Sequence, residues 1–523
     1  MNHRSKLPTD VAARLFLGVC LVVPSCFAQP APSPRQEGDL KAFAAIAGAG
    51  LMENDDYEYL QELSDDVGAR VTGSPEGTKA VAWGVEKMKA IGLENVHTEP
   101  WQLFRGWTRL STEAELLAPI RRRLMVDSMG WVGSTSHGGV EAQLVPVNAY
   151  QLPDEVKRNA ANWSGKILLL VQKGAPPADR LAARAKLGDF LREAHRAGAL
   201  AVIGGQGGSK AFGMHLTHTG MLGVNVLFDI PVVSMASEDQ EQLERYLDRG
   251  DSPRLHLNIQ NRFTDGPVPS ANVIGEIRGS TNPEQIVVVG GHLDSWDLAS
   301  GSTDNGVGTA ATLGAAEAIL KSGFRPKRTI RFVLFNGEEQ GDNGSFNYVR
   351  SHHDEMGNHV AAIILDDGQG PVTGFALGGR NDLLSPVRQF AGSLRALGRL
   401  SVDDDTVFDT DTGPFILAGL PGIGLKQDSA AYQFTHHSAV DTFDKVQADI
   451  LDRDATLMAL TAFWIADRSD RLATPWPPEK TAHMLVEKHD DVVLKLFGVW
   501  PFGNLGTDTD ATVKPGPGSS TRK

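Results

Sequence analysis

Apolar runs and amphipathic segments alternate along the second half of the chain. The runs QIVVVGG (285–291), RTIRFVLFN (328–336) and VAAIILDD (360–367) have the length and β-branched content of buried strands. Between the first two runs lies GTAATLGAAEAILKSG (308–323), whose apolar spacing predicts a helix. Apolar strands joined by helical crossovers predict a mostly parallel sheet with helices on both faces. We therefore expect a three-layer α/β/α domain over residues 266–470.

The middle of the chain follows a different pattern. Residues 120–265 contain short apolar runs that are separated by glycine turns and two helical segments: KILLLVQKG (166–174), AGALAVIGGQGG (197–208) and IPVVSMA (230–236). This change predicts a separate domain inserted into the first one. Residues 55–119, with a glycine-rich turn and an amphipathic helix, are expected to form the N-terminal part of the α/β/α domain.

The first residues have the order of a secretory signal peptide. Basic residues precede the apolar run LFLGVCLVV (15–23), and small residues follow it, so we expect cleavage after Ala28. The run is too short to span a bilayer, and no later stretch is long and apolar enough to do so. The sequence predicts a secreted or periplasmic protein. VPSC (23–26) weakly resembles a lipoprotein cleavage box, an alternative that its proline disfavours.

Both ends of the expected mature chain have a biased composition. Residues 29–54 predict a flexible linker, QPAPSPRQEGD (29–39), followed by an N-terminal helix. Residues 471–523 form a C-terminal extension rich in proline, glycine and polar residues, which we expect to be partly disordered. Cys20 and Cys26 both lie in the signal peptide, so the mature chain has no disulfide and no thiolate ligand.

Metal-competent side chains follow three of the predicted strands at the points where those strands end. His292 follows the first run, Glu338 and Glu339 follow the second, and Asp366 and Asp367 follow the third. In open α/β sheets the carboxyl ends of the strands meet at one edge, where ligands bind. Three strands that end in this way predict a functional cluster rather than three surface turns.

The composition of this cluster favours zinc or a similar divalent metal, because imidazole is mixed with carboxylates and no thiolate is available. Carboxylates so close together repel one another unless a cation compensates them. More than four candidate ligands predict two ions, about 3.5–4 Å apart, with one bridging carboxylate. Asp304 is the expected bridge, since Gly301 and Gly306 allow a sharp loop near the ions. The net charge of −14 makes nucleic acid an unsuitable partner.

Five motifs together resemble a known family. GGHLDSWD, STDNGVG, FNGEEQG, ILDDG and HHSAVDT (436–442) occur in the order and spacing of the co-catalytic zinc aminopeptidases, in particular the carboxypeptidase Q group and its bacterial relatives. The resemblance covers about residues 55–470 and includes an inserted protease-associated domain, which matches residues 120–265. It implies a zinc-exopeptidase fold with two Zn²⁺ per chain.

The resemblance also implies which residues hold the metal. The ligands would be His292, Asp304, Glu339, Asp366 and His437, with Asp304 bridging the two ions. Asp366 is preferred over Asp367 by its place directly after the strand. His437 is preferred over His436 by its distance of four residues from Asp441.

Four further residues have an implied role in catalysis. Glu338 would be the general base, and Asp294 would be a carboxylate that orients the imidazole of His292. His436 stands where some relatives have a tyrosine that polarises the substrate carbonyl, and Asp411 resembles a position near the substrate.

The resemblance implies a zinc-dependent exopeptidase that hydrolyses terminal peptide bonds of short peptides or dipeptides through a metal-activated water. One alternative is an amide-processing enzyme of the same fold, like the glutaminyl cyclases, which use essentially one zinc. Another is a receptor-like binding protein, which would lack ligands or the base. The expected partners are short peptides, and a homodimer stays open as the assembly.

Overall fold

The computed structural model describes residues 34–178, 185–204, 214–496, 498–503 and 505. The predicted signal peptide (1–28), with its two cysteines, and the end of the C-terminal tail lie outside these residues. The chain divides into two compact units, Met1–Lys41 and Ala42–Lys523, and both sheets of the protein belong to the second unit.

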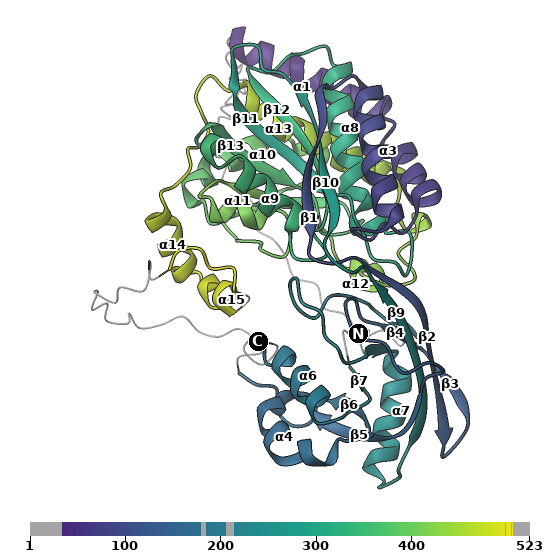
Figure 1. Ribbon diagram of the computed structural model, residues 1–523. Coiled ribbons are helices and arrows are strands. Elements are labelled where there is room, and N and C mark those ends of the chain that lie inside the picture. Colours follow the sequence, from purple (N-terminus) through teal and green to yellow (C-terminus); the bar gives the residue numbers. More distant parts are fainter. Residues whose placement is uncertain (1–33, 179–184, 205–213, 497, 504, 506–523) are drawn as a thin grey trace, which may run out of the picture. The chain divides into compact units, whose positions relative to one another are not determined.

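The first sheet has eight strands (Figure 1). Four neighbouring strands at its centre run parallel to one another. In spatial order the sheet consists of β1 (Glu94–Leu103), β10 (Val268–Ile277), β12 (Arg328–Phe335), β11 (Asn282–His292), β13 (His359–Ile364), β16 (Gly422–Gln427), β14 (Val372–Ala376) and β15 (Ser401–Asp403). The parallel strands are β12, β11, β13 and β16.

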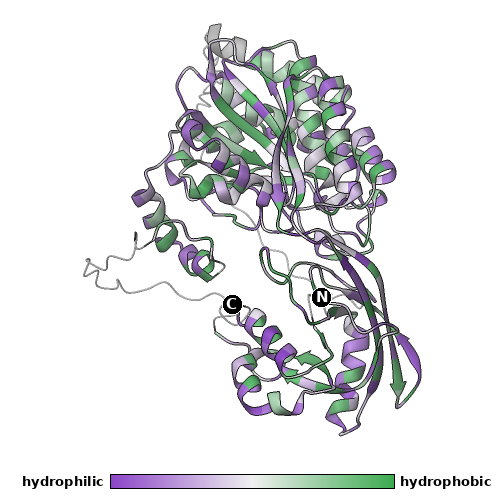
Figure 2. Cartoon of the chain, viewed as in Figure 1, coloured by the Kyte–Doolittle hydropathy of each residue, from purple (hydrophilic) through white to green (hydrophobic). Residues whose placement is uncertain are grey.

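Helices cover both faces of this sheet. Val287 and Val289 of β11 belong to a core shared with α2 (Asp56–Gln61), α3 (Pro75–Ile91), α8 (Val307–Lys321), α10 (Leu384–Ser393) and α13 (Ala448–Asp467). Ile286 and Val288, which point the other way, share a core with α9 (Asn343–Ser351) and α11 (Thr412–Leu417). Figure 2 shows the hydrophobic residues concentrated on these strands. The predicted three-layer α/β/α fold is confirmed.

Small residues let α8 approach β11 closely. A Cβ atom on Gly291 would come within 2.7 Å of the backbone carbon of Gly308, in the first turn of the helix. The hydroxyl of Thr309 also donates a hydrogen bond to the carbonyl oxygen of His292 at 2.7 Å. These contacts fix the loop that precedes α8 against the carboxyl end of β11, where the predicted cluster lies.

The second sheet also has eight strands and mixes directions. Its spatial order is β3 (Arg122–Leu124), β2 (Trp107–Ala118), β9 (Arg254–Phe263), β5 (Val140–Asn148), β6 (Ile167–Val171), β7 (Ala201–Ile203), β8 (Val232–Met235) and β4 (Val126–Ser128). The chain between its strands forms α4 (Leu152–Asn159), α6 (Leu187–Arg196) and α7 (Ser237–Asp248). We call residues 107–263, which hold this sheet, the second lobe.

Three segments differ from the sequence-based expectation. Residues 107–118 fall in the range expected for the α/β/α domain (55–119), but they form β2, which pairs with β9 of the second sheet, with Trp107 opposite Phe263. Helix α1 (Pro34–Met52) begins inside the expected linker. The C-terminal extension contains α14 (Pro478–Glu487) and α15 (Asp490–Leu496), whose apolar residues pack with α11.

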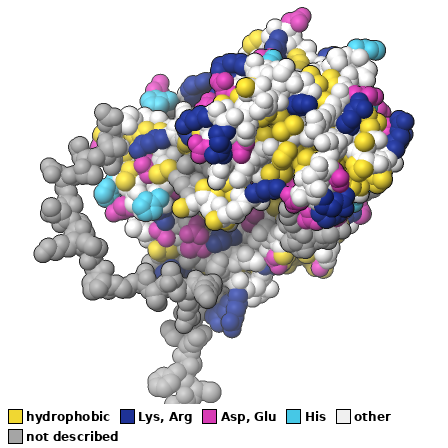
Figure 3. Space-filling view, turned by 90° about the horizontal axis from the view of Figure 1, so that it is seen from below, with side chains coloured by type: hydrophobic (Ala, Val, Ile, Leu, Met, Phe, Trp, Pro, Cys, Tyr) yellow, Lys and Arg dark blue, Asp and Glu magenta, His cyan; other side chains and the backbone are white. Residues whose placement is uncertain are grey.

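None of the described helices is long and apolar enough to cross a bilayer. On the face seen from below, Lys and Arg side chains are interspersed with Asp and Glu side chains (Figure 3).

Candidate metal centre

The four parallel strands bring the predicted residues to one edge of the first sheet. His292 is the last residue of β11, Glu338 and Glu339 follow β12, and Asp366 follows β13. His437 comes after the short helix α12 (Tyr432–Thr435), which follows β16. Because these strands are neighbours and run in the same direction, their ends converge.

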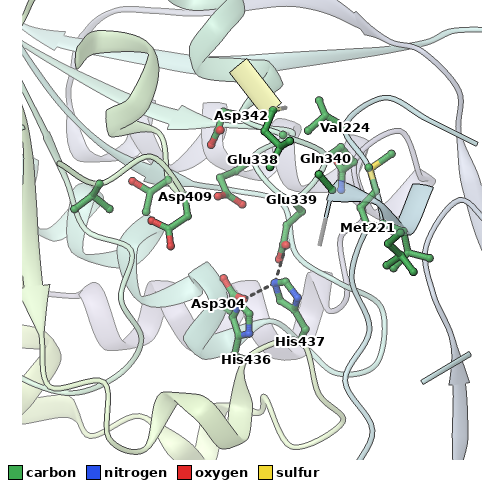
Figure 4. Close-up of a pocket in the computed structure, with 18 of the residues that line it drawn as sticks. Met221, Val224, Asp304, Glu338, Glu339, Gln340, Asp342, Asp409, His436 and His437 are labelled. Atoms are coloured by element: carbon green, nitrogen blue, oxygen red, sulfur yellow. Dashed lines mark ion pairs between the residues drawn. The ribbon is translucent and has the colours of Figure 1, made fainter. Parts of the chain in front are cut away.

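Two groups of potential ligand atoms share the carboxylate of Asp304. In the first group, His292 Nε2 lies 3.3 Å from Asp304 Oδ1 and 3.4 Å from Asp366 Oδ1. In the second group, His437 Nε2 lies 3.2 Å from Asp304 Oδ2 and 2.9 Å from Glu339 Oε2 (Figure 4). Ligand atoms around a tetrahedral zinc ion at about 2.0 Å are about 3.3 Å apart. The spacing in the first group fits such an ion. On the second side, the candidate ligand atoms that lie close together are those of Asp304, His436 and His437, and Glu339 contacts His437.

These side chains are withdrawn from solvent. The exposed fraction is 1% for His292, 4% for Asp304 and 9% for Glu339. Within the described part of the chain, His292 Nε2, Asp304 Oδ2 and Glu339 Oε1 are buried and have no hydrogen-bond partner. Buried polar atoms without partners are costly, so their presence at the centre of the cluster indicates a ligand.

Burial and mutual charge shift the pKa values in the cluster. Burial, with a smaller contribution from Asp304, raises the pKa of Glu339 to about 7. Burial favours the neutral form of His437, but the carboxylates of Glu339 and Asp304 together outweigh it and raise the pKa of His437 to about 10. Without a metal, the positive charge of a protonated imidazole therefore compensates the carboxylates. A divalent cation at the same place would compensate them with the imidazole left neutral.

The loop that carries Asp304 is held by two residues from distant parts of the sequence. The carboxylate of Asp441 accepts hydrogen bonds from the backbone N–H groups of Thr303 (2.6 Å) and Asp304 (3.2 Å). The buried guanidinium of Arg70 donates to the carbonyl oxygens of Leu293, Ser300 and Gly301. The cis peptide bond between residues 304 and 305 lies in the same loop.

Glu338 lines the cavity beside the first group, and its Oε2 lies 3.8 Å from His292 Nε2. Burial raises the pKa of Glu338 well above its ordinary value. The carboxylate of Asp294 accepts hydrogen bonds from the backbone N–H groups of Gly337 (2.8 Å) and Glu338 (3.3 Å). It therefore fixes the turn that presents Glu338.

The expected contact between Asp294 and His292 takes a different form. His292 Nδ1 lies 3.0 Å from the backbone oxygen of Asp294 and 3.6 Å from its carboxylate oxygen Oδ1. The carbonyl is the closer acceptor because the carboxylate turns towards the Gly337–Glu338 backbone and towards the Thr72 hydroxyl, 2.9 Å away.

The members of each ambiguous pair have different surroundings, although His436 lies with Asp304 and His437 among the potential metal ligands. Asp366 faces His292, whereas Asp367 Oδ2 accepts from the backbone N–H of Gln427 at 3.2 Å. The ring of His436 stacks on that of His437 at 3.7 Å, and its Nε2 lies 3.9 Å from Asp304 Oδ2. Burial, together with the neighbouring His437, lowers the pKa of His436 to about 3, so its imidazole is neutral.

Residues that the sequence did not identify also surround the cluster. A cavity of about 1360 Å³ is lined by Tyr432, Asp342 and Asp409 beside the predicted residues. The indole N–H of Trp296 donates to Glu339 Oε2 at 2.5 Å. Asp411, which the resemblance placed near the substrate, is fully buried and does not line the cavity, and burial raises its pKa to about 7. Tyr432 stands one helical turn before His436, but a lone tyrosine gives no signal in a single sequence.

Comparison with known proteins identifies the family of the chain. The family model of peptidase family M28 matches residues 272–462. Carboxypeptidase Q of Mus musculus is 31% identical over 433 residues, which cover 83% of this chain and 90% of the relative. Carboxypeptidase Q of Homo sapiens is also 31% identical, over 437 residues, with 83% of this chain and 90% of that protein covered.

Solved structures agree on the fold. A peptidase M28 precursor from Shewanella amazonensis SB2B is 27% identical, with a TM-score of 0.73, and the match covers 84% of this chain and 99% of that one. A zinc aminopeptidase from Bacillus subtilis is 22% identical, with a TM-score of 0.61 over 80% of this chain and 97% of that one, a likeness of fold.

The geometry of the centre predicts close to two divalent ions per chain in the purified protein. Because the ions bind the folded state, chelation should lower the melting temperature, and adding zinc back should restore it. A ligand at 100 times its dissociation constant stabilises by about 2.7 kcal/mol. Elemental analysis beside calorimetry measures both effects. A chelated protein whose melting temperature does not respond to zinc would contradict the assignment.

Proposed function

The chain belongs to peptidase family M28, and from this membership and its metal centre we infer that it is a zinc-dependent exopeptidase acting on short peptides. The observation that carries the proposal is the position of the Glu338 carboxylate, at the cavity wall beside two groups of ligand atoms that share Asp304.

The donor set is suited to two zinc ions. One would be held by His292, Asp304 and Asp366, and the other by Asp304, Glu339 and His437. Their mixture of imidazole and carboxylate, and the unpartnered buried atoms among them, support this choice. When bound, such ions supply Lewis-acid polarisation of a carbonyl group and lower the pKa of a water molecule to about 7.

Glu338 is the proposed general base. Its carboxylate takes a proton from the attacking water and gives it to the leaving amine. The hydrogen bonds from Gly337 and Glu338 to Asp294 hold this side chain at the edge of the cavity. His436 is neutral and lines the same cavity, which supports a role as hydrogen-bond donor to the substrate carbonyl oxygen.

The second lobe supports a preference for short substrates. Met221 and Val224 of this lobe line the cavity together with Glu338 and Gln340 (Figure 4). Val224 packs so closely that a Cβ atom on Gly341 would come within 2.7 Å of its side chain. A wall of this kind beside the metal centre limits the length of chain that can extend past it.

The alternatives that the sequence left open are less well supported. Two groups of ligand atoms favour the exopeptidase over an amide-processing enzyme with one zinc, and the presence of every ligand and the base argues against a non-catalytic receptor. The N-terminal sequence supports export to the periplasm or the medium.

Substitutions of the two adjacent glutamates should have different effects. Glu338→Gln keeps the shape but cannot accept a proton, so kcat should fall about 10²–10⁴-fold while both ions are retained. Glu339→Gln weakens a ligand, so metal content should fall together with the rate, and excess zinc should restore part of both. Metal analysis beside kcat measures the difference. Loss of metal in Glu338→Gln, with two ions kept in Glu339→Gln, would reverse the two roles.

The cavity also predicts which peptides are cleaved. For a series of peptides with two to about ten residues, kcat/KM should decrease with length, and casein should be a poor substrate. Because Asp342 and Asp409 line the cavity, acetylation of the peptide amine should reduce kcat/KM more than amidation of the carboxyl group. Efficient cleavage of casein would exclude the length limit. A larger loss on amidation would indicate recognition of the carboxyl end.

A further inference from the structure

The second lobe contacts the chain segment that carries His437. The backbone N–H of Thr219 donates to the carbonyl oxygen of His437 at 2.9 Å, and the ring Nδ1 of His437 lies 3.3 Å from the carbonyl oxygen of Thr219. His218 forms an antiparallel bridge with Ser438, and its Nδ1 lies 2.6 Å from the carbonyl oxygen of His436. Segment 218–219 therefore pairs with segment 436–438 as a short two-stranded ribbon.

This pairing determines how His437 presents its ring. His437 has a positive φ of 57°, a conformation that non-glycine residues adopt only when their surroundings impose it. A carbonyl at Nδ1 favours the tautomer with the proton on that atom, which leaves Nε2 free to face Asp304 and Glu339. Thr219, from the second lobe, supplies both the backbone restraint and the carbonyl.

An ion pair holds Thr219 in this position. The guanidinium of Arg109 on β2 donates to Thr219 Oγ1 at 3.0 Å and to the carbonyl oxygen of Ser128 at 2.5 Å. It also binds both carboxylate oxygens of Asp297, at 2.8 and 2.9 Å. Only 10% of the Arg109 side chain is exposed, so this pair is weakly screened by water. Asp297 lies just after the His292 strand, so the pair joins the second lobe to the first sheet.

The residue before Asp297 makes a parallel connection to Glu339. The ring of Trp296 packs edge-on against Trp107 at 6.0 Å and Trp131 at 6.1 Å, both from the second lobe. Its indole N–H donates to Glu339 Oε2 at 2.5 Å, and its ring centroid lies 5.8 Å from that of His437. Glu339 is therefore oriented by a side chain whose own position depends on the second lobe.

The other group of ligands is held differently. The Nδ1 atom of His292 lies 3.0 Å from the carbonyl oxygen of Asp294. The backbone oxygen of His292 accepts a hydrogen bond from the Thr309 hydroxyl. Both partners belong to the α/β/α part of the chain. Among the described residues, the contacts from the second lobe thus reach His437 directly and Glu339 through Trp296, but not His292.

We propose that the second lobe sets the zinc affinity of one position only, the one formed by Asp304, Glu339 and His437, with Arg109, Asp297 and Trp296 as positioning residues. This inference rests on the proposed zinc-dependent function. In this proposal the second lobe has two roles: it orients ligands of the metal centre, and it forms a wall of the cavity that limits substrate length.

Zinc binding to Asp297→Asn and Trp296→Phe tests the proposal. Asp297→Asn keeps the shape but loses the ion pair, and Trp296→Phe keeps a ring but loses the N–H donor. Chelated full-length protein is titrated with Zn²⁺ in competition with a coloured chelator. Each variant should bind one ion as the parent does and the other about 10- to 100-fold more weakly, the usual effect of removing a group that orients a ligand.

Two further variants identify the position and control for stability. In a His437→Ala background, Asp297→Asn should not weaken the remaining ion further, because the position it supports is already lost. Arg122→Gln breaks another ion pair of the second lobe, with Asp239 at 2.7 Å, and should leave both zinc affinities unchanged.

The possible failures are distinguishable. A parent protein that binds no zinc would overturn the proposed function and this inference together. If the parent binds two ions but Asp297→Asn and Trp296→Phe weaken both equally or neither, only the inference is overturned. The same holds if Arg122→Gln reproduces their effect, or if Asp297→Asn weakens the ion that remains in the His437→Ala background.

Discussion

The carboxylate of Asp304, between the imidazoles of His292 and His437, is the contact on which the site depends. Its two oxygens lie 3.3 and 3.2 Å from the two Nε2 atoms, and the residue is almost fully buried. A carboxylate in this position draws together His292, at the end of β11, and His437, which lies in the segment after α12. It keeps its charge in a buried place only because positive charge surrounds it.

Several parts of the fold support the loop that carries Asp304. Helix α8 approaches β11 so closely that only glycine fits at 291, and a Cβ atom on Gly308 would meet the carbonyl oxygen of Leu365. These contacts place the loop before α8 beside His292. Arg70 and Asp441 hold the loop from outside, one through carbonyl oxygens and the other through N–H groups. The second lobe, through Thr219 and Trp296, orients the ligands on the His437 side.

The sequence predicted those elements whose pattern lies within one short stretch of residues. Long apolar runs identified β11, β12 and β13, and the acids and imidazole at their ends identified the edge where they meet. The residues that support the site were missed. Arg70 binds a carbonyl 223 positions away, and Trp296 and Asp297 act through the second lobe, so nothing in their sequence neighbourhood indicates a partner. Residues 107–118 were included in the α/β/α domain, whereas their strand pairs with β9 in the second sheet, because a strand's pattern does not specify which strand it pairs with.

The arrangement of ions around Asp304 is tested most directly by the anomalous scattering of a zinc-loaded crystal at the zinc absorption edge. We expect two peaks about 3.5–4 Å apart on either side of the Asp304 carboxylate. One should lie next to His292 and Asp366, and the other next to Glu339 and His437. A single peak, or a second peak bound by His436 or Asp367 in place of these ligands, would contradict this account of the site.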